Sequence, residues 1–186
     1  MLILTVLLAL VVGWRTGGRL VHYVETPLYL LPLPILALVM QRALGLLPAE
    51  YYLLCAPVLL LSSYAMIFLF LWRNRRLKRT ASLAGLGSLC NLAVIAANGW
   101  RMPVSAAAAG LLSPEGLSQL TAGAVPMYTL ENSATRLIFL GDVICCPIPL
   151  IGGFASVGDV LLAAGVFFCL LTIMKPVKLP RWMVLG

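Results

Sequence analysis

The sequence predicts an all-α fold, a polytopic integral membrane protein of about five transmembrane helices with a structured outer loop. Of its 186 residues, 62% are hydrophobic and only 10% are charged, and the mean hydropathy is +1.03. A soluble domain of this size cannot bury so much apolar surface. Long apolar runs separated by short cationic loops therefore favour a single membrane domain over residues 1–186.

The distribution of basic residues predicts the orientation of the chain. The segment 73–79 carries five cations and no acid, and the positive-inside rule places it in the cytoplasm. Alternation then also places the loop with Arg15 and Arg19 and the tail with Lys175 and Lys178 inside. We therefore expect a bacterial inner-membrane protein with its N-terminus out and its C-terminus in. Its partners are membrane lipids and possibly another membrane protein, and the net charge of +7 reflects topology rather than nucleic-acid binding.

The apolar runs give the expected helix boundaries. The run 2–14 has no basic residue before it and no small-residue cleavage pattern after it, so it is interpreted as a retained helix rather than a signal peptide. In the second helix Pro27 suits the first position, whereas Pro32 and Pro34 predict a kink. The expected helices are 2–14, 27–46, 51–72, 80–97 and 157–174.

Helix 80–97 has features of a packing helix. Gly85, Gly87 and Ser88 are small enough to permit close helix contact. Asn91 is a polar residue within this apolar run, and we expect its side chain to bond to a neighbouring helix.

The segment 98–156 is expected to form an outer cap. Residues 113–120 begin with Ser-Pro-Glu and predict a short Pro-initiated helix at the interface. The apolar run 136–151 is interrupted by Gly141, Asp142 and two prolines, so it is too broken to span. A re-entrant or surface-lying segment is the favoured interpretation.

Two carboxylates lie at the start of apolar runs in this cap. The pattern Gly-Asp-Val-aliphatic occurs at Asp142 and again at Asp159. Ser156 precedes Asp159 by three residues, which matches the capping box of a helix N-terminus. Asp142 has no such serine, and we interpret it as an ion-pair partner of Arg101 or Arg136.

A catalytic interpretation takes the two carboxylates together. Two carboxylates brought close together cannot both ionise easily, so the pair can act as acid and base toward water. Asp142 followed by Phe154 and Asp159 is loosely similar to the end of the bacterial lipoprotein signal peptidases, over about thirty residues. That resemblance implies an intramembrane aspartyl hydrolase, although the Asn-x-x-Asp-Arg motif of those enzymes is absent.

A second resemblance lies at residues 98–104, which read Asn-Gly-Trp-Arg-Met-Pro-Val. This segment resembles the Asn-Gly-Gly-Arg-Met-Pro-Val signature of a family of small uncharacterised bacterial multi-pass membrane proteins, which also carry a Gly-Asp segment before the last helix. The resemblance implies membership of a domain family of unknown function. Because Trp100 replaces the second glycine, we expect a backbone φ that is not positive at this position.

These observations favour a binding or accessory membrane protein over an enzyme. Five cysteines without paired spacing and a single histidine, His22, predict neither a metal site nor a cofactor. The expected site is an outward polar pocket for a lipid head group, a small ligand or a partner segment. The alternatives are a hydrolase with Asp142 and Asp159 as catalytic residues, and a small transporter. The expected pocket residues are Asn98, Arg101, Arg136, Asp142 and Asp159.

Overall fold

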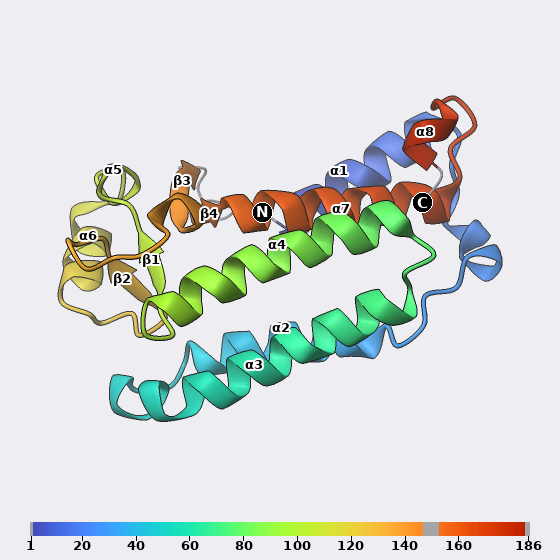
Figure 1. The fold of residues 1–186 in the computed structure, drawn as a ribbon. Coiled ribbons are helices and arrows are strands. Elements are labelled where there is room, and N and C mark those ends of the chain that lie inside the picture. Colours follow the sequence, from blue (N-terminus) through green and yellow to red (C-terminus); the bar gives the residue numbers. More distant parts are fainter. Residues whose placement is uncertain (1, 147–152, 185–186) are drawn as a thin grey trace.

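The structure, a computed structural model, describes residues 2–146 and 153–184. Within them the chain is mostly helical, and five longer helices form a bundle. In Figure 1, α2 and α3 lie side by side in one layer, while α4 and α1 both pack on α7 in the other. These helices are α1 (Leu2–Arg15), α2 (Pro32–Leu44), α3 (Ala49–Arg73), α4 (Lys78–Ala97) and α7 (Val157–Met174).

Three of these helices are long and apolar enough to cross a membrane. They are α3, α4 and α7, with 25, 20 and 18 residues. The helices α1 and α2 have only 14 and 13 residues. At about 1.5 Å per residue each extends roughly 20 Å, less than the roughly 30 Å of a hydrocarbon core. The expectation of five spanning helices is therefore not confirmed.

The helix expected at 27–46 begins later, at Pro32. The buried side chain of Asn74 binds the preceding segment, accepting from Tyr29 N at 2.9 Å and donating to Tyr29 O at 2.8 Å. The next residue, Leu30, has a φ of +58°, which is incompatible with a continuous helix. Pro32 therefore occupies the first position of α2, the place expected for Pro27, and Pro34 lies in the first turn of the helix.

The packing of α4 on α7 depends on small residues. A Cβ atom added at Gly165 would lie 2.8 Å from Ala84 N, and one at Gly158 would lie 2.6 Å from Gly87 O. Only residues without large side chains permit this approach. Close contact was expected at Gly87, and it occurs there. A Cβ atom added at Gly85 would lie an ordinary 3.7 Å from a side-chain atom of Leu71, so the contact there is not unusually close.

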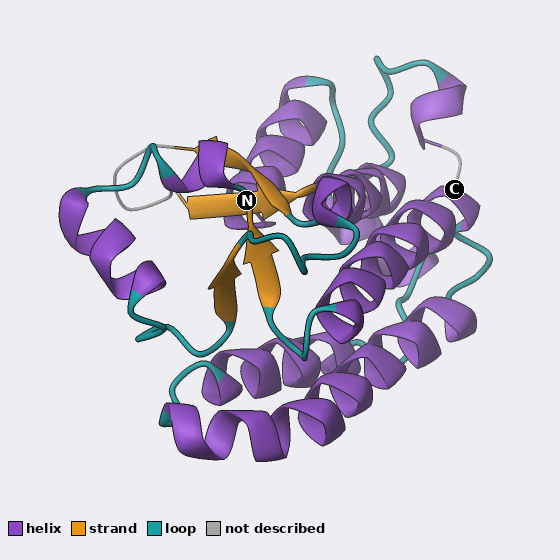
Figure 2. Ribbon diagram, turned by 60° about the vertical axis from the view of Figure 1, so that its left-hand side comes forward, coloured by secondary structure: helices purple, strands orange, loops and turns teal. Residues whose placement is uncertain are grey.

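The cap contains a small mixed sheet, so the all-α prediction was wrong for this part of the chain. The strand order is β2-β1-β3-β4, with β1 parallel to β2 and β3, and β3 antiparallel to β4 (Figure 2). A small core of Val104, Ala108, Ala109 and Leu120 lies beneath it. The strands are β1 (Met102–Val104), β2 (Tyr128–Leu130), β3 (Asp142–Cys146) and β4 (Gly153–Ser156).

Short helices complete the cap. The helix expected near residues 113–120 is α6 (Pro114–Thr121), capped by the Ser113 side chain. A four-residue helix, α5 (Ala106–Ala109), follows β1. The broken run, expected to be a re-entrant or surface-lying segment, contains η2 (Ile138–Leu140) and β3, whose backbone pairs with β1 and β4. The rest of that run, residues 147–152, lies outside the described residues.

Candidate functional site

The N-terminus of α7 is the centre of a polar network that joins α7 to α4. The Ser156 Oγ accepts from Asp159 N at 2.9 Å, and Asp159 Oδ2 accepts from Ser156 N at 3.2 Å, which completes the predicted capping box. Asn91 Nδ2 donates to Asp159 Oδ1 at 2.8 Å, and Ser156 Oγ donates to Asn91 Oδ1 at 2.7 Å. The interhelical bond expected for Asn91 is thus confirmed. Both carboxylate oxygens of Asp159 are bound within this network.

Asp142 lies next to this network but has no comparable partners. It is the first residue of β3, opposite Ser156 in the pairing with β4, and it is only 3% exposed. Its backbone carbonyl accepts from Ser105 N at 3.1 Å. Its Oδ1 is buried and has no hydrogen-bond partner among the described residues. A buried carboxyl oxygen without a partner is costly, because its hydration has been lost without replacement.

The surroundings of Asp142 favour its protonated form. Burial, and then the nearby negative charge of Asp159, raise the pKa of the Asp142 carboxyl to about 7. Burial also raises the pKa of Tyr128 in β2, as do the charges of Asp142 and Asp159, whereas Arg42 acts in the opposite direction. The two carboxyl groups therefore differ in environment, since Asp159 accepts hydrogen bonds on both oxygens, whereas the Asp142 carboxyl is buried and its pKa is raised.

Arg101 is the basic residue directly before β1. It is partly buried, and its Nε is buried with no hydrogen-bond partner in residues 2–146 and 153–184. Arg136 is exposed. Across that same described part of the chain, neither arginine forms an ion pair with Asp142. The prediction of such a pair was wrong, because Asp142 is enclosed by the sheet while the Arg136 side chain faces outward.

Asn98 binds the backbone of the cap rather than presenting a free amide. Its Oδ1 accepts from Arg136 N at 2.9 Å, and its Nδ2 donates to Arg136 O at 2.8 Å and to Val94 O at 2.7 Å. Asn98 is the residue that ends α4, so this contact fixes the start of the η2 segment against that helix. Its carboxamide is therefore committed to structure.

The turn after Asn98 is also different from the expectation. Gly99 and Trp100 have φ values of +65° and +66°, so the prediction that Trp100 does not have a positive φ was wrong. Trp100 N donates to Ile95 O at 2.9 Å, which requires this conformation, and the residue packs against the cluster around Tyr52. Packing and this hydrogen bond offset the cost of a left-handed tryptophan.

Two tyrosines near the site were not singled out from the sequence. Tyr52 is 1% exposed and its hydroxyl donates to Trp100 O at 2.6 Å, next to Arg101. Tyr128 lies opposite Met102 in the sheet, and its ring meets the Phe154 ring edge-on with centroids 6.2 Å apart. In the sequence Tyr52 has the appearance of an interfacial aromatic residue, and its pairing with residue 100 has no local signature.

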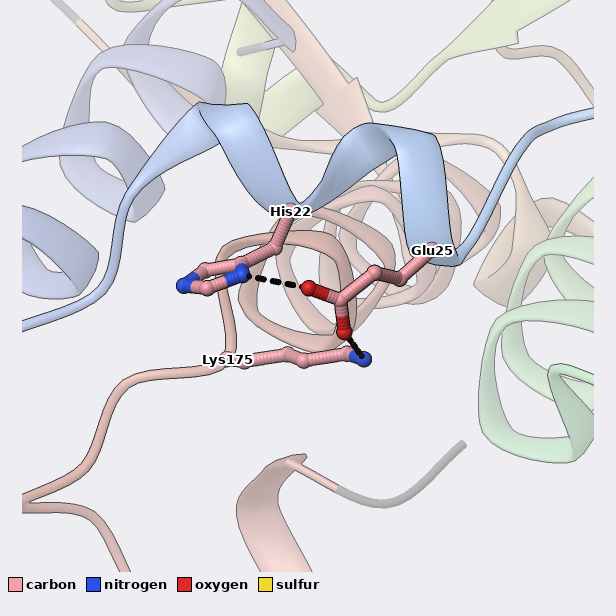
Figure 3. Close-up of polar contacts among 3 residues, drawn as sticks. All are labelled: His22, Glu25 and Lys175. Atoms are coloured by element: carbon pink, nitrogen blue, oxygen red, sulfur yellow. Dashed lines mark hydrogen bonds and ion pairs between the residues drawn. The ribbon is translucent and has the colours of Figure 1, made fainter.

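A second polar cluster lies at the opposite end of the bundle (Figure 3). Glu25, the last residue of η1 (Leu20–Glu25), accepts from Lys175 Nζ at 2.6 Å and lies 3.0 Å from His22 Nδ1. Hydrogen bonds from Lys175 and then His22 lower the pKa of Glu25. Glu25 is exposed and His22 and Lys175 are partly exposed, and the three side chains join η1 to the end of α7. This arrangement fits a structural tie rather than a reactive centre.

Comparisons with known proteins identify a family without a known activity. The model of a family of unknown function (DUF5317) matches residues 25–171, which include α2, α3, α4, the cap and most of α7. Searches of curated proteins and of solved structures gave no match. The expectation of an uncharacterised domain family is confirmed, whereas the signature motif and the bacterial origin stay predictions. No group of three or more His, Cys, Asp or Glu side chains arranged for a metal occurs among the described residues.

Proposed function

The chain belongs to DUF5317, a family of unknown function, and we propose that it is an integral membrane protein that binds a small zwitterionic head group at its cap. Its three long apolar helices support insertion in a membrane. In the proposed topology the cap faces the outside of a bacterial inner membrane, and the cations of residues 73–79 lie in the cytoplasm.

The proposal rests on two buried groups that lack hydrogen-bond partners, one from an acidic residue and one from a basic residue. Asp142 Oδ1 and Arg101 Nε are both buried, and neither has a hydrogen-bond partner among the described residues. Buried polar atoms in native proteins are almost always paired with protein, water or a ligand. A bound molecule that supplies both a cation and an anion would satisfy both groups.

Phosphoethanolamine is the simplest group with this chemistry. Its phosphate suits the planar guanidinium of Arg101, which donates in a fixed fork geometry. Its ammonium suits Asp142, where a positive charge would favour the ionised carboxylate and lower its pKa. The residues on either side of Arg101 are fixed, because the Tyr52 hydroxyl donates to Trp100 O and Tyr128 lies opposite Met102 in the sheet. Asp142 lies on the neighbouring strand, opposite Val104.

The other residues expected in the pocket do not contact the ligand in this proposal. Asn98 fixes the cap to α4, and Asp159 fixes the start of α7. Arg136 contributes its backbone to the Asn98 contact, while its exposed side chain lies outside the proposed site. The ligand therefore contacts Arg101 and Asp142, with Tyr128 beside them.

An aspartyl hydrolase is the second candidate, and one observation favours it. Burial, and then the charge of Asp159, raise the pKa of Asp142 to about 7, and a carboxyl with a raised pKa beside a second carboxyl is a feature of acid–base catalysts. Against it, both Asp159 oxygens already accept hydrogen bonds from Asn91 and Ser156. A base role for Asp159 would break the network that joins α4 to α7. No observation of this kind favours the other two expectations, a small transporter and a protein partner.

Binding to the purified full-length chain in neutral detergent tests the proposal. The probes are phosphoethanolamine in solution, phosphatidylethanolamine in phosphatidylcholine nanodiscs, and phosphocholine, whose quaternary ammonium has no N–H to donate. We expect both ethanolamine probes to bind if the ligand is a free zwitterion, and only the lipid to bind if the site needs a membrane anchor. Phosphocholine should bind about 10- to 100-fold more weakly than phosphoethanolamine, the effect of a lost charged hydrogen bond.

Variants locate the site. Arg101→Gln and Asp142→Asn should each weaken ethanolamine binding by a similar factor, while Arg136→Gln, an exposed cation at the same end, serves as the control. Equal binding of all three variants and the wild type would exclude this site. Turnover of a membrane substrate that Asp142→Asn abolishes, without any ethanolamine binding, would favour the hydrolase instead.

A further inference from the structure

An apolar cavity lies between the two helix layers, at a distance from the cap site. Its volume is about 380 Å³, and α1, α2, α3, α4 and α7 all contribute to its wall. Among its lining residues only Gln41 and Thr80 have polar side chains other than cysteine. Gln41 Nε2 donates to Ser63 Oγ at 2.9 Å, so that polar group is already satisfied. The cavity thus suits a hydrocarbon chain better than a polar molecule.

Part of the cavity wall lies beside the basic loop between α3 and α4. Phe70 at the end of α3 and Thr80 at the start of α4 both line it, as does Leu28. Arg76 lies over the Tyr29 ring at 5.0 Å and donates to Pro27 O, which fixes the loop against the segment that carries Leu28. The basic loop therefore lies beside the wall of an apolar cavity.

Four charges of this loop are exposed and are not neutralised by an acid among the described residues. Arg73, Arg75, Arg76 and Lys78 are exposed, and none of them forms an ion pair with an acid within the described residues. Glu25, the acid in η1, is already bonded to Lys175. A negative group at the rim would meet a field that nothing in residues 73–79 neutralises.

We infer that this cavity binds one anionic phospholipid, with an acyl chain between the helix layers and its phosphate on the basic loop of residues 73–79. Each buried methylene contributes favourably, and basic residues near a membrane surface attract anionic lipid. The site is independent of the cap proposal, because it uses different residues at the other end of the bundle. Failure of one leaves the other untouched.

Lipid that remains bound to the purified full-length chain gives the test. The protein is solubilised in neutral detergent, exchanged into defined phosphatidylglycerol or phosphatidylcholine, and the bound lipid is counted by native mass spectrometry. We expect one phosphatidylglycerol per chain to persist through washing that removes phosphatidylcholine. Removing two cations with Arg75→Gln and Arg76→Gln should weaken phosphatidylglycerol binding about 25-fold, at about one kcal/mol per basic residue.

Filling the cavity separates this site from general attraction to charge. Val166 lines the cavity on α7, whereas Val160 on the same helix is 41% exposed and does not. Val166→Phe should abolish retention of the lipid, and Val160→Phe should leave it intact. Leu38→Phe and Leu36→Phe form the same comparison on α2, in case a change in α7 prevents folding.

Three results would overturn the inference. Equal retention in Val166→Phe and Val160→Phe, repeated for the α2 pair, would exclude the cavity. Equal retention of phosphatidylcholine and phosphatidylglycerol would exclude recognition of the anion. An effect of Lys178→Gln, an exposed cation outside residues 73–79, as large as that of the Arg75 and Arg76 changes would assign binding to overall charge.

Discussion

The carboxamide of Asn98 binds both backbone polar groups of Arg136, accepting from its N–H at 2.9 Å and donating to its carbonyl at 2.8 Å. Asn74 binds Tyr29 in the same way, at 2.9 and 2.8 Å. Both asparagines end a helix, and each bound residue precedes a leucine with positive φ, Leu137 or Leu30. The same pair of hydrogen bonds, from an asparagine carboxamide to one backbone residue, thus fixes a distant segment at each end of the bundle.

These asparagines should differ in their effect on stability. Asn74 is 2% exposed, whereas Asn98 is only partly buried. We expect Asn74→Ala to cost about 2–4 kcal/mol and Asn98→Ala about 1–3 kcal/mol, since unmet polar groups cost more where water is excluded. Thermal unfolding in detergent measures both, with exposed Ser133→Ala as the control. A loss no larger than that of the control in either variant would show that these contacts do not stabilise the fold.

The left-handed backbone at Trp100 predicts an unusual order of stability. Trp100→Ala and Trp100→Gly both remove the ring from the cluster around Tyr52, so their packing losses are equal. Only alanine retains a Cβ at a φ of +66°, which costs about 1–2 kcal/mol. The glycine variant should therefore unfold at a higher temperature than the alanine variant. Equal stabilities, or a more stable alanine variant, would contradict the observed backbone conformation.

Much of the helical part could be predicted from the sequence because its determinants are local. Hydropathy placed α3, α4 and α7 within a few residues, and Ser156 with Asp159 indicated the capping box. The sheet could not be predicted in this way. Its strands β1 and β2 have three residues each and pair across 26 positions, so neither alternation nor a short turn marks them.

The candidate site was found only in part. Asp142 stood out because a charge beside apolar residues needs an explanation, but its burial depends on pairing with β4 and on the cap as a whole. The role of Asn98 follows from a contact 38 residues away in the chain, which the local sequence does not encode. The raised pKa of Asp142 likewise reflects tertiary enclosure rather than a motif.

The close approach of α4 and α7 predicts a severe effect for one added methyl group. In Gly158→Ala the new Cβ would lie 2.6 Å from Gly87 O and from Asn91 Cγ, so the helices must separate. We expect a loss of about 1–3 kcal/mol. Gly116→Ala in α6 is the control, because its nearest new contact is an ordinary 3.5 Å and alanine favours a helix. Comparable stabilities for the two variants would argue against tight packing at Gly158.

Asp142 should make the protein less stable as the pH rises. Its folded pKa of about 7 exceeds the unfolded value, so ionisation above pH ~4 favours the unfolded state until the folded group also ionises near pH 7. The wild type should lose on the order of 2–4 kcal/mol across this window relative to Asp142→Asn. The lowered pKa of Glu25 acts oppositely, since its stabilisation is lost as the pH falls, and it cancels in the comparison. Parallel pH profiles for the wild type and Asp142→Asn would contradict the raised pKa.

The ionisation of Asp142 in the presence of a zwitterion tests the central claim most directly. Infrared titration of the full-length protein, with Asp142→Asn subtracted to isolate this carboxyl, reports its pKa with and without phosphoethanolamine. We predict a value near 7 in the free protein and a clear decrease when the ammonium group binds, with no decrease in Arg101→Gln at the same concentration. A pKa that phosphoethanolamine and phosphatidylethanolamine both leave unchanged in the wild type would contradict the proposed binding site.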